Sequence, residues 1–376
     1  MNLTPVNLLK SSLAKLVGPS YSSHRLPPHL RPERRVLSFA LATVFLLVFS
    51  ACNRGRNRVL EVNYVSAVQA TLRDQVATIY NRVATVKNGE RVEVLEHEKR
   101  FARVRTASGV EGWIEQRYLV DQQIFDGLGK LTKDNLSDPV QAPGVLRNDT
   151  NLHLTPGRET EHLYQLAAGA KVSVLRRSTT EKQPGVVVKP KAGGKTAGPA
   201  REDWWLVRDA ENRVGWVLAR MVDIDVPLDI AQYAEGQRFV AFFALNQVQD
   251  PAKEGADKNV SQYLCVLTEP HDGLAYDYDQ IRVFTWNVRK HRYETAYREH
   301  GLNGALPVTV TTENFDKEGT LPVFILRVQD DKGNVNERKY KLNTPIVRRV
   351  LAPGEQPVRS APRKSESHKT KRKRQK

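Results

Sequence analysis

The chain of 376 residues contains only two cysteines, Cys52 and Cys265. Two cysteines are too few for a framework of several disulfides. A permanent transmembrane helix needs ~20 apolar residues, whereas the apolar run at residues 36–49 has 14. The sequence therefore offers neither a disulfide scaffold nor a helix of full membrane-spanning length. Because Cys52 lies just after the apolar run, it is a candidate for another covalent role.

Recognisable catalytic motifs are also missing. No glycine-rich phosphate loop and no nucleophile elbow occurs. A cysteine peptidase needs a nucleophilic cysteine with a histidine base, but Cys265 lies in an apolar segment and is expected in the core. The spacing of a zinc or calcium site is absent from the histidines and aspartates of the C-terminal third, namely His271, His291, His300, Asp272, Asp277 and Asp279. We therefore expect no enzyme active site, no metal and no cofactor.

The formal net charge of +16 lies mainly at the ends of the chain. Residues 1–35 carry +5, residues 53–58 carry +3 and residues 363–376 carry +7, so only +1 remains for the rest. A duplex-binding domain would hold its basic face on the folded surface, so no specific nucleic-acid binding is expected. The basic tail, residues 351–376, is predicted to be disordered and to attract anionic lipid or wall polymer.

Residues 1–51 have the parts of a secretory leader. Arginines precede the apolar run and small residues follow it, as in secretory signals. The ending Phe49-Ser50-Ala51-Cys52 resembles the lipobox of bacterial lipoproteins, in which the cysteine thiol receives a diacylglycerol group and becomes the mature N-terminus. Phe49 departs from that pattern, which usually has Leu, Val or Ile. The resemblance implies that Cys52 is lipidated and that residues 52–63 form a tether.

Two other interpretations of the leader stay open. The run could be an uncleaved anchor, or the chain could be cut at Ala51. All three interpretations export the chain, and the lipid anchor would make the membrane one of its partners.

Two copies of one pattern follow the leader. Each has a leucine-containing opening, a glycine-led strand with alternating valines, an aromatic strand and a Gly-Trp strand. The copies are Leu72, Gly89, Val92, Val94, Phe101 and Gly112-Trp113, then Leu152, Gly169, Val172, Val174, Trp204-Trp205 and Gly215-Trp216. The alternation predicts half-buried strands. Trp113 and Trp216 are expected in the cores, and the glycine before each is expected to permit a tight bend.

This ordered set resembles bacterial SH3-type domains, the five-stranded barrels of envelope proteins. The resemblance implies SH3-like domains at residues 64–122 and 143–226, which in that family usually bind cell-wall peptides or a partner protein. The first copy departs by having Phe101 where a tryptophan is usual. The second departs by an insertion, residues 179–201, whose Lys, Gly and Pro content predicts disorder.

The adjacent pair Trp204-Trp205 gives a candidate binding residue. Neighbouring residues of a strand point to opposite faces, so one indole is expected to face outward. Exposed aromatic side chains supply apolar area for extended peptides. We therefore predict that Trp204 is exposed and binds ligand.

Residues 237–350 are predicted to form an antiparallel β domain after a short helix near Ala231. Strands are expected at residues 239–245, 263–267, 281–286, 292–298, 307–312, 322–328 and 335–342. The fold class is thus mainly β, with two small SH3-like barrels followed by an antiparallel β domain and a disordered basic tail.

These features predict a non-catalytic, lipid-anchored protein of the cell envelope, on the periplasmic side or the cell surface. Its expected partner is a cell-wall peptide or an envelope protein. The alternative is a cell-wall hydrolase or a hydrolase accessory subunit to which the C-terminal domain contributes. Nucleic-acid binding through the basic tail is a weaker alternative.

Overall fold

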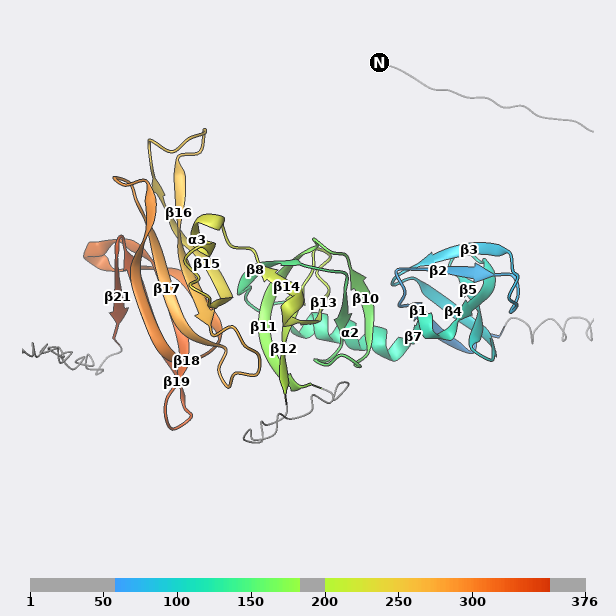
Figure 1. The fold of residues 1–376 in the computed structure, drawn as a ribbon. Coiled ribbons are helices and arrows are strands. Elements are labelled where there is room, and N and C mark those ends of the chain that lie inside the picture. The colour runs from blue at the N-terminus through green and yellow to red at the C-terminus, as the bar shows by residue number, and fades with distance from the viewer. Residues whose placement is uncertain (1–57, 183–199, 352–376) are drawn as a thin grey trace, which may run out of the picture. The chain divides into compact units, whose positions relative to one another are not determined.

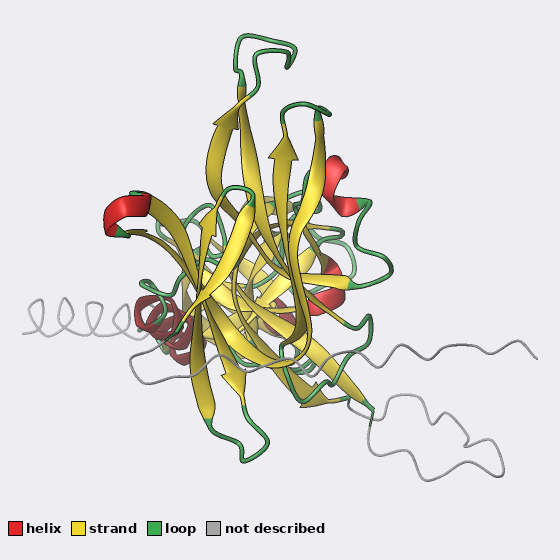
Figure 2. Cartoon of the chain, turned by 90° about the vertical axis from the view of Figure 1, so that its left-hand side faces the viewer, coloured by secondary structure: helices red, strands yellow, loops and turns green. Residues whose placement is uncertain are grey.

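The computed structural model describes residues 58–182 and 200–351 (Figure 1). Strands form 57% of the structure and there are two α-helices in this part of the chain, so the predicted mainly β fold is confirmed (Figure 2). Neither helix is long and apolar enough to cross a membrane. The leader, Cys52, most of the predicted insertion and the basic tail lie outside the described residues, and the statements about them stay predictions.

The first sheet contains seven antiparallel strands in the order β3-β2-β6-β5-β4-β1-β7. Their bounds are β1 Glu61–Val65, β2 Gln69–Arg73, β3 Arg82–Lys87, β4 Arg91–Glu98, β5 Phe101–Thr106, β6 Glu111–Glu115 and β7 Leu119–Asp121, with a 3-10 helix η1 at Gln116–Tyr118. Alternate residues face inward, and Leu72, Val92 and Val104 are completely buried there. Because β1 begins at Glu61, the predicted tether at residues 52–63 extends too far.

The second sheet has the order β10-β9-β13-β12-β11-β8-β14, which is the order of the first sheet with every number raised by seven. Its elements are β8 Ala142–Leu146, β9 Thr150–His153, β10 His162–Leu166, β11 Lys171–Glu181, β12 Arg201–Arg208, β13 Val214–Leu218, η2 Ala219–Met221 and β14 Val222–Ile224. The irregularity in β4 after Val94 recurs in β11 after Val174. The two sequence copies therefore fold alike.

The predicted insertion at residues 179–201 is too long at both ends. Strand β11 continues to Glu181, which pairs with Arg201 at the start of β12. Of the predicted insertion, only residues 183–199 lie outside the described part of the chain.

The tryptophans of the two Gly-Trp strands were expected in the core, but they do not lie there. In each strand the residue after the tryptophan faces the interior: Ile114 is 1% exposed and Val217 is 0% exposed. Trp113 and Trp216 are half-buried, because strand alternation places them on the opposite face.

The glycines of these strands were expected to permit a tight bend. They instead allow two strands to approach each other closely. A Cβ atom on Gly112 would lie 2.8 Å from Cβ of Leu72, and one on Gly215 would lie 2.8 Å from Cβ of Leu152. Real Cβ atoms essentially never come so close. The glycine of each Gly-Trp pair thus lets two strands lie close together at the same position of the two sheets.

Helix α2 (Gln122–Asp134) joins the first two sheets and was not predicted. Oδ1 of Asp121 caps it by accepting a hydrogen bond from the Ile124 amide at 2.9 Å, a usual N-cap arrangement. Its apolar side lies between the sheets, where Leu128 packs with residues of both. Leu131 packs in the cluster that contains Trp216, so the helix covers the outer face of β13.

The third sheet is a simple antiparallel meander from β15 to β21 in sequence order. After helix α3 (Leu228–Ala231), its elements are β15 Arg238–Gln249, β16 Asn259–Thr268, β17 Tyr278–Asn287, β18 Arg292–Asn314, η3 Asp316–Glu318, β19 Thr320–Gln329, β20 Val335–Asn343 and β21 Ile346–Val350. The seven predicted segments lie in six of these strands, the short helix is present, and β21 was not predicted. The segments predicted at residues 292–298 and 307–312 form one long strand, β18. Cys265 is buried, as predicted.

The second and third sheets share one apolar core, which includes Val174, Phe242 and Val266. Gln141, which is 0% exposed, also joins them. Its Oε1 accepts a hydrogen bond from the Val308 amide at 2.7 Å, and its carbonyl accepts one from the Phe242 amide at 2.9 Å. The two sheets therefore form one packed unit.

Candidate ligand-binding groove

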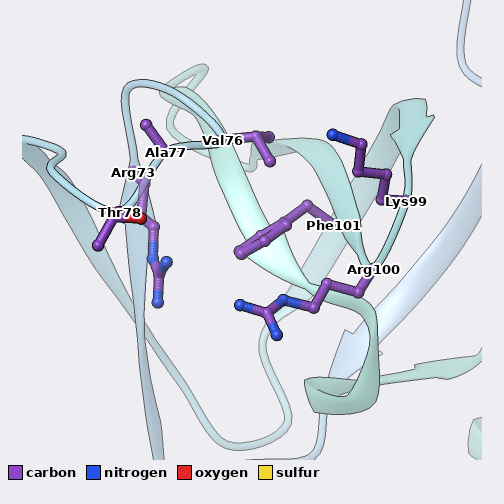
Figure 3. A pocket seen from close by; sticks show the side chains of 7 residues that line it. All are labelled: Arg73, Val76, Ala77, Thr78, Lys99, Arg100 and Phe101. Carbon is purple, nitrogen blue, oxygen red and sulfur yellow. The ribbon is translucent and has the colours of Figure 1, made fainter.

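The first sheet has an open groove of about 580 Å³ at one end, within the range of small-molecule sites. One wall is the loop between β2 and β3, and the other is the turn between β4 and β5 (Figure 3). The lining residues are Arg73, Val76, Ala77, Thr78, Lys99, Arg100 and Phe101. The groove thus combines an apolar loop and an aromatic ring with three basic side chains.

Phe101 and Arg73 form the base of the groove. Phe101 is 4% exposed, and the Arg73 guanidinium lies 5.1 Å from its ring centroid and 4.1 Å from that of Tyr80. The same guanidinium is 3.4 Å from Oε1 of Glu115. These contacts hold Arg73 across the groove, since a cation over an aromatic face is attracted to it.

Lys99 and Arg100 form a basic rim. Both are exposed, and Lys99 adopts the left-handed conformation with φ 52° that closes the hairpin. The Arg100 guanidinium lies 5.4 Å from the Phe101 ring centroid. Among the ion pairs of the described residues none involves Lys99 or Arg100. Two basic groups are therefore available to an anionic ligand beside an aromatic surface.

The opposite wall, residues 74–81, is held at its two ends. Asp74 accepts hydrogen bonds from the backbone amide of Asn81 at 2.8 Å and from its side chain at 2.9 Å. These bonds lower the pKa of Asp74 below its ordinary value. At the tip of the loop Ile79 is 85% exposed. The groove can thus offer an extended ligand both apolar area and positive charge.

The described residues hold no group of three or more metal-ligating side chains. Of the three aspartates considered for calcium, Asp272, Asp277 and Asp279, the first two pair with arginines, at 2.7 Å from Arg238 and 3.1 Å from Arg177. Burial raises the pKa of the Cys265 thiol, which opposes formation of a thiolate.

The prediction that Trp204 is exposed is wrong, because its exposed fraction is 1% and that of Trp205 is 3%. Strand β12 is covered on both faces. Trp205 packs in the shared core, and Trp204 on the other face lies against His153, with ring centroids 5.2 Å apart. Burial and the neighbouring His162 lower the pKa of His153 to about 4, so this ring is neutral at pH 7. The predicted ligand-binding role of Trp204 itself stays a prediction.

Sequence reasoning did not find the groove of the first sheet. Phe101 was noted only as a departure from the usual tryptophan, although it follows directly after Lys99-Arg100. An aromatic residue next to two basic residues in a hairpin turn was the available signal. The contribution of Arg73 and of the loop depends on tertiary approach and has no local pattern.

Two models of known families match the first two sheets. Residues 69–120 match the model of the bacterial SH3 domain, and residues 149–223 match that of the GW (Gly-Tryp) dipeptide domain. The second copy, for which SH3-type was predicted, is thus matched by a model named after its Gly-Trp pair. A search of curated proteins found no match.

Among solved structures, NlpC2 from Trichomonas vaginalis is 12% identical, with 74% of this chain and 96% of that one covered and a TM-score of 0.15. An NlpC/P60 family protein from Bacillus cereus ATCC 10987 is 10% identical, with 76% and 95% covered and a TM-score of 0.21. The family match confirms the predicted resemblance: this chain is a protein that contains a bacterial SH3 domain, at residues 69–120.

Proposed function

We propose that this chain is a non-catalytic, lipid-anchored protein of the cell envelope that binds cell-wall peptide in the groove of its first sheet. Bacterial SH3 and GW domains are cell-wall-binding domains, which supports the general role. The observation that carries the specific one is the pair of basic side chains without ion pairs among the described residues, Lys99 and Arg100, beside Phe101.

The chemistry of the groove favours an extended peptide with carboxylate groups. Cell-wall stem peptides carry free carboxylates on a short extended chain. Arginine binds carboxylates through two parallel hydrogen bonds, and lysine binds them as a point charge. Phe101 and the loop at residues 76–78 would contact the apolar side chains of such a peptide.

Reversing the charge of the rim should abolish most of this binding. For the full chain carrying Lys99→Glu and Arg100→Glu, we expect affinity for purified cell-wall sacculi to fall at least about tenfold, a loss of ~1.4 kcal/mol. Both side chains are exposed, so the fold should be unchanged. Co-sedimentation at two salt concentrations measures the affinity and separates the effect from screened attraction by the basic tail.

The control is Lys290→Glu with Arg292→Glu, which reverses two exposed charges at the β17–β18 hairpin, both of which pair with Glu294. This variant should sediment with sacculi like the wild type. If both double variants lose binding equally, the attraction is general and the groove is not the site.

The lipid anchor is tested separately at Cys52. Metabolic labelling with a fatty-acid analogue should mark the wild-type chain, and Cys52→Ser should remove the label because the thiol is the acceptor. Export should persist in the variant. Equal labelling of the two forms would show that Cys52 is not the site of lipidation.

A further inference from the structure

The second sheet has a counterpart of the groove of the first sheet. The strand pairing matches the main residues of the two sites. Trp204 pairs with the residue after Val217, just as Phe101 pairs with the residue after Ile114. His153 lies opposite the Gly-Trp tryptophan of its sheet, as Arg73 does in the first. The loop between β9 and β10 therefore occupies the place of the loop that forms one wall of the open groove.

This loop, residues 154–161, is closed over Trp204. The Arg158 guanidinium donates hydrogen bonds from Nε and Nη2 to Oε2 of Glu202 at 2.9 and 2.8 Å. Oγ1 of Thr160 lies 3.0 Å from Nδ1 of His153, whose ring packs against Trp204. The loop is thus fixed at two points next to the indole.

The indole nitrogen of Trp204 has no hydrogen-bond partner although the side chain is 1% exposed. Buried donors in proteins are nearly always paired, because leaving one unpaired costs free energy. An extended peptide in an open groove would bring backbone carbonyls, which are the acceptors that Trp204 lacks.

The charge of this second groove is opposite to that of the first. The two residues before Trp204 are Glu202 and Asp203, where the first sheet has the basic Lys99 and Arg100. Asp203 already pairs with Arg177 and Arg238. Among the described residues, the only ion-pair partner of Glu202 is Arg158, which is 38% exposed and belongs to the loop between β9 and β10.

We propose that the second sheet contains a closed peptide-binding groove in which Arg158 takes the place of a cationic side chain of the ligand. The ligand is an extended peptide with a lysine or arginine side chain. Its cation replaces Arg158 at Glu202, the loop opens, and one of its carbonyls accepts the hydrogen bond from Trp204. This site is separate from the wall-binding groove of the first sheet and does not depend on it.

The first test is the accessibility of Trp204 in the full chain. In Arg158→Ala, the share of the tryptophan fluorescence that acrylamide can quench should rise by about the contribution of one of the five tryptophans. The increase should disappear when Trp204→Phe is added. Arg147→Ala is the matched control, because it removes another arginine–carboxylate pair of the same sheet, with Asp223. Quenching unchanged in Arg158→Ala, or an increase that survives Trp204→Phe, would overturn the proposal.

The second test is binding of two blocked tripeptides, acetyl-Ala-Arg-Ala-amide and acetyl-Ala-Ala-Ala-amide. The arginine peptide should bind Arg158→Ala at least tenfold more tightly than wild type, and the further change Glu202→Gln should remove this gain. Equal binding of the neutral peptide, or no binding to Arg158→Ala, would contradict the proposal. All these variants retain Lys99 and Arg100, so sacculus binding reports on the first groove independently.

Discussion

Replacing Arg177 by alanine is expected to destabilise the chain by about 3 kcal/mol, the lower end of the loss on breaking a buried ion pair. Arg177 is 5% exposed and its Nη2 lies 2.8 Å from Oδ1 of Asp203, which is 1% exposed. Its Nη1 also donates to the carbonyl of Tyr276 at 2.8 Å and lies 3.1 Å from Asp277. One side chain of the second sheet thus serves four acceptors, because its Nη2 also donates to the carbonyl of Leu274 at 3.1 Å, and three of the four lie in the loop before β17.

The size of the loss follows from what remains at Asp203. Burial opposes its ionisation, but the hydrogen bond and charge of Arg177, together with hydrogen bonds from the Gly273 amide and Thr179, hold the pKa of Asp203 below its ordinary value. In the variant Arg238 still lies 2.9 Å from this carboxylate. One cation therefore remains, and we expect the lower end of the range.

Urea unfolding of the full chain followed by circular dichroism measures this loss. The neighbouring Arg176→Ala is the control, because Arg176 is 51% exposed and its ion pair with Asp138 lies at the surface. Exposed pairs contribute about 0–1 kcal/mol. A loss below about 1 kcal/mol for Arg177→Ala would mean that the buried network does not hold the two sheets together.

Gly215→Ala should destabilise the chain by about 1–3 kcal/mol, the usual cost of overpacking. The new Cβ would lie 2.8 Å from Cβ of Leu152, 3.3 Å from its Cα and 3.3 Å from the carbonyl oxygen of His153. These atoms belong to or adjoin the backbone of β9, so no flexible side chain can simply move aside. The strand itself has to shift.

Gly129→Ala in helix α2 is the matched control. Nothing lies within 4 Å of a Cβ at this position, and alanine favours the helix over glycine by up to about 1 kcal/mol. The midpoint of thermal unfolding should therefore fall for Gly215→Ala and rise slightly for Gly129→Ala. A Gly215→Ala chain as stable as the wild type would show that the close approach of β9 and β13 is not required.

The strands were predictable because alternation is a local property of the sequence. The Val92 and Val94 pair and its counterpart Val172 and Val174 indicated the same strand twice, and the repeated strand order confirms it. The direction of the tryptophans was not predictable in the same way. Alternation fixes only which residues share a face, and the helix α2 that covers Trp216 is brought there by tertiary packing.

The site was harder to predict than the fold for a similar reason. The sequence pointed to Trp204 because it assumed that one face of β12 meets solvent, whereas the loop between β9 and β10 covers that face. The corresponding loop of the first sheet forms one wall of an open groove whose lining includes Phe101. One of the contacts that hold the second loop joins Arg158 to Glu202, which lie 44 residues apart, so no local sequence pattern reveals it.

The most direct test of the central claim is photocrosslinking from within the groove. A benzoyl-phenylalanine at position 78, in place of the exposed Thr78 of the lining, should crosslink the full chain to soluble cell-wall peptides. The same group at position 288, where Val288 is 39% exposed on the third sheet, should not. We expect the crosslinks from position 78 to disappear when Lys99 and Arg100 are both changed to glutamate. No crosslink from position 78, or equal crosslinking from both positions, would contradict it.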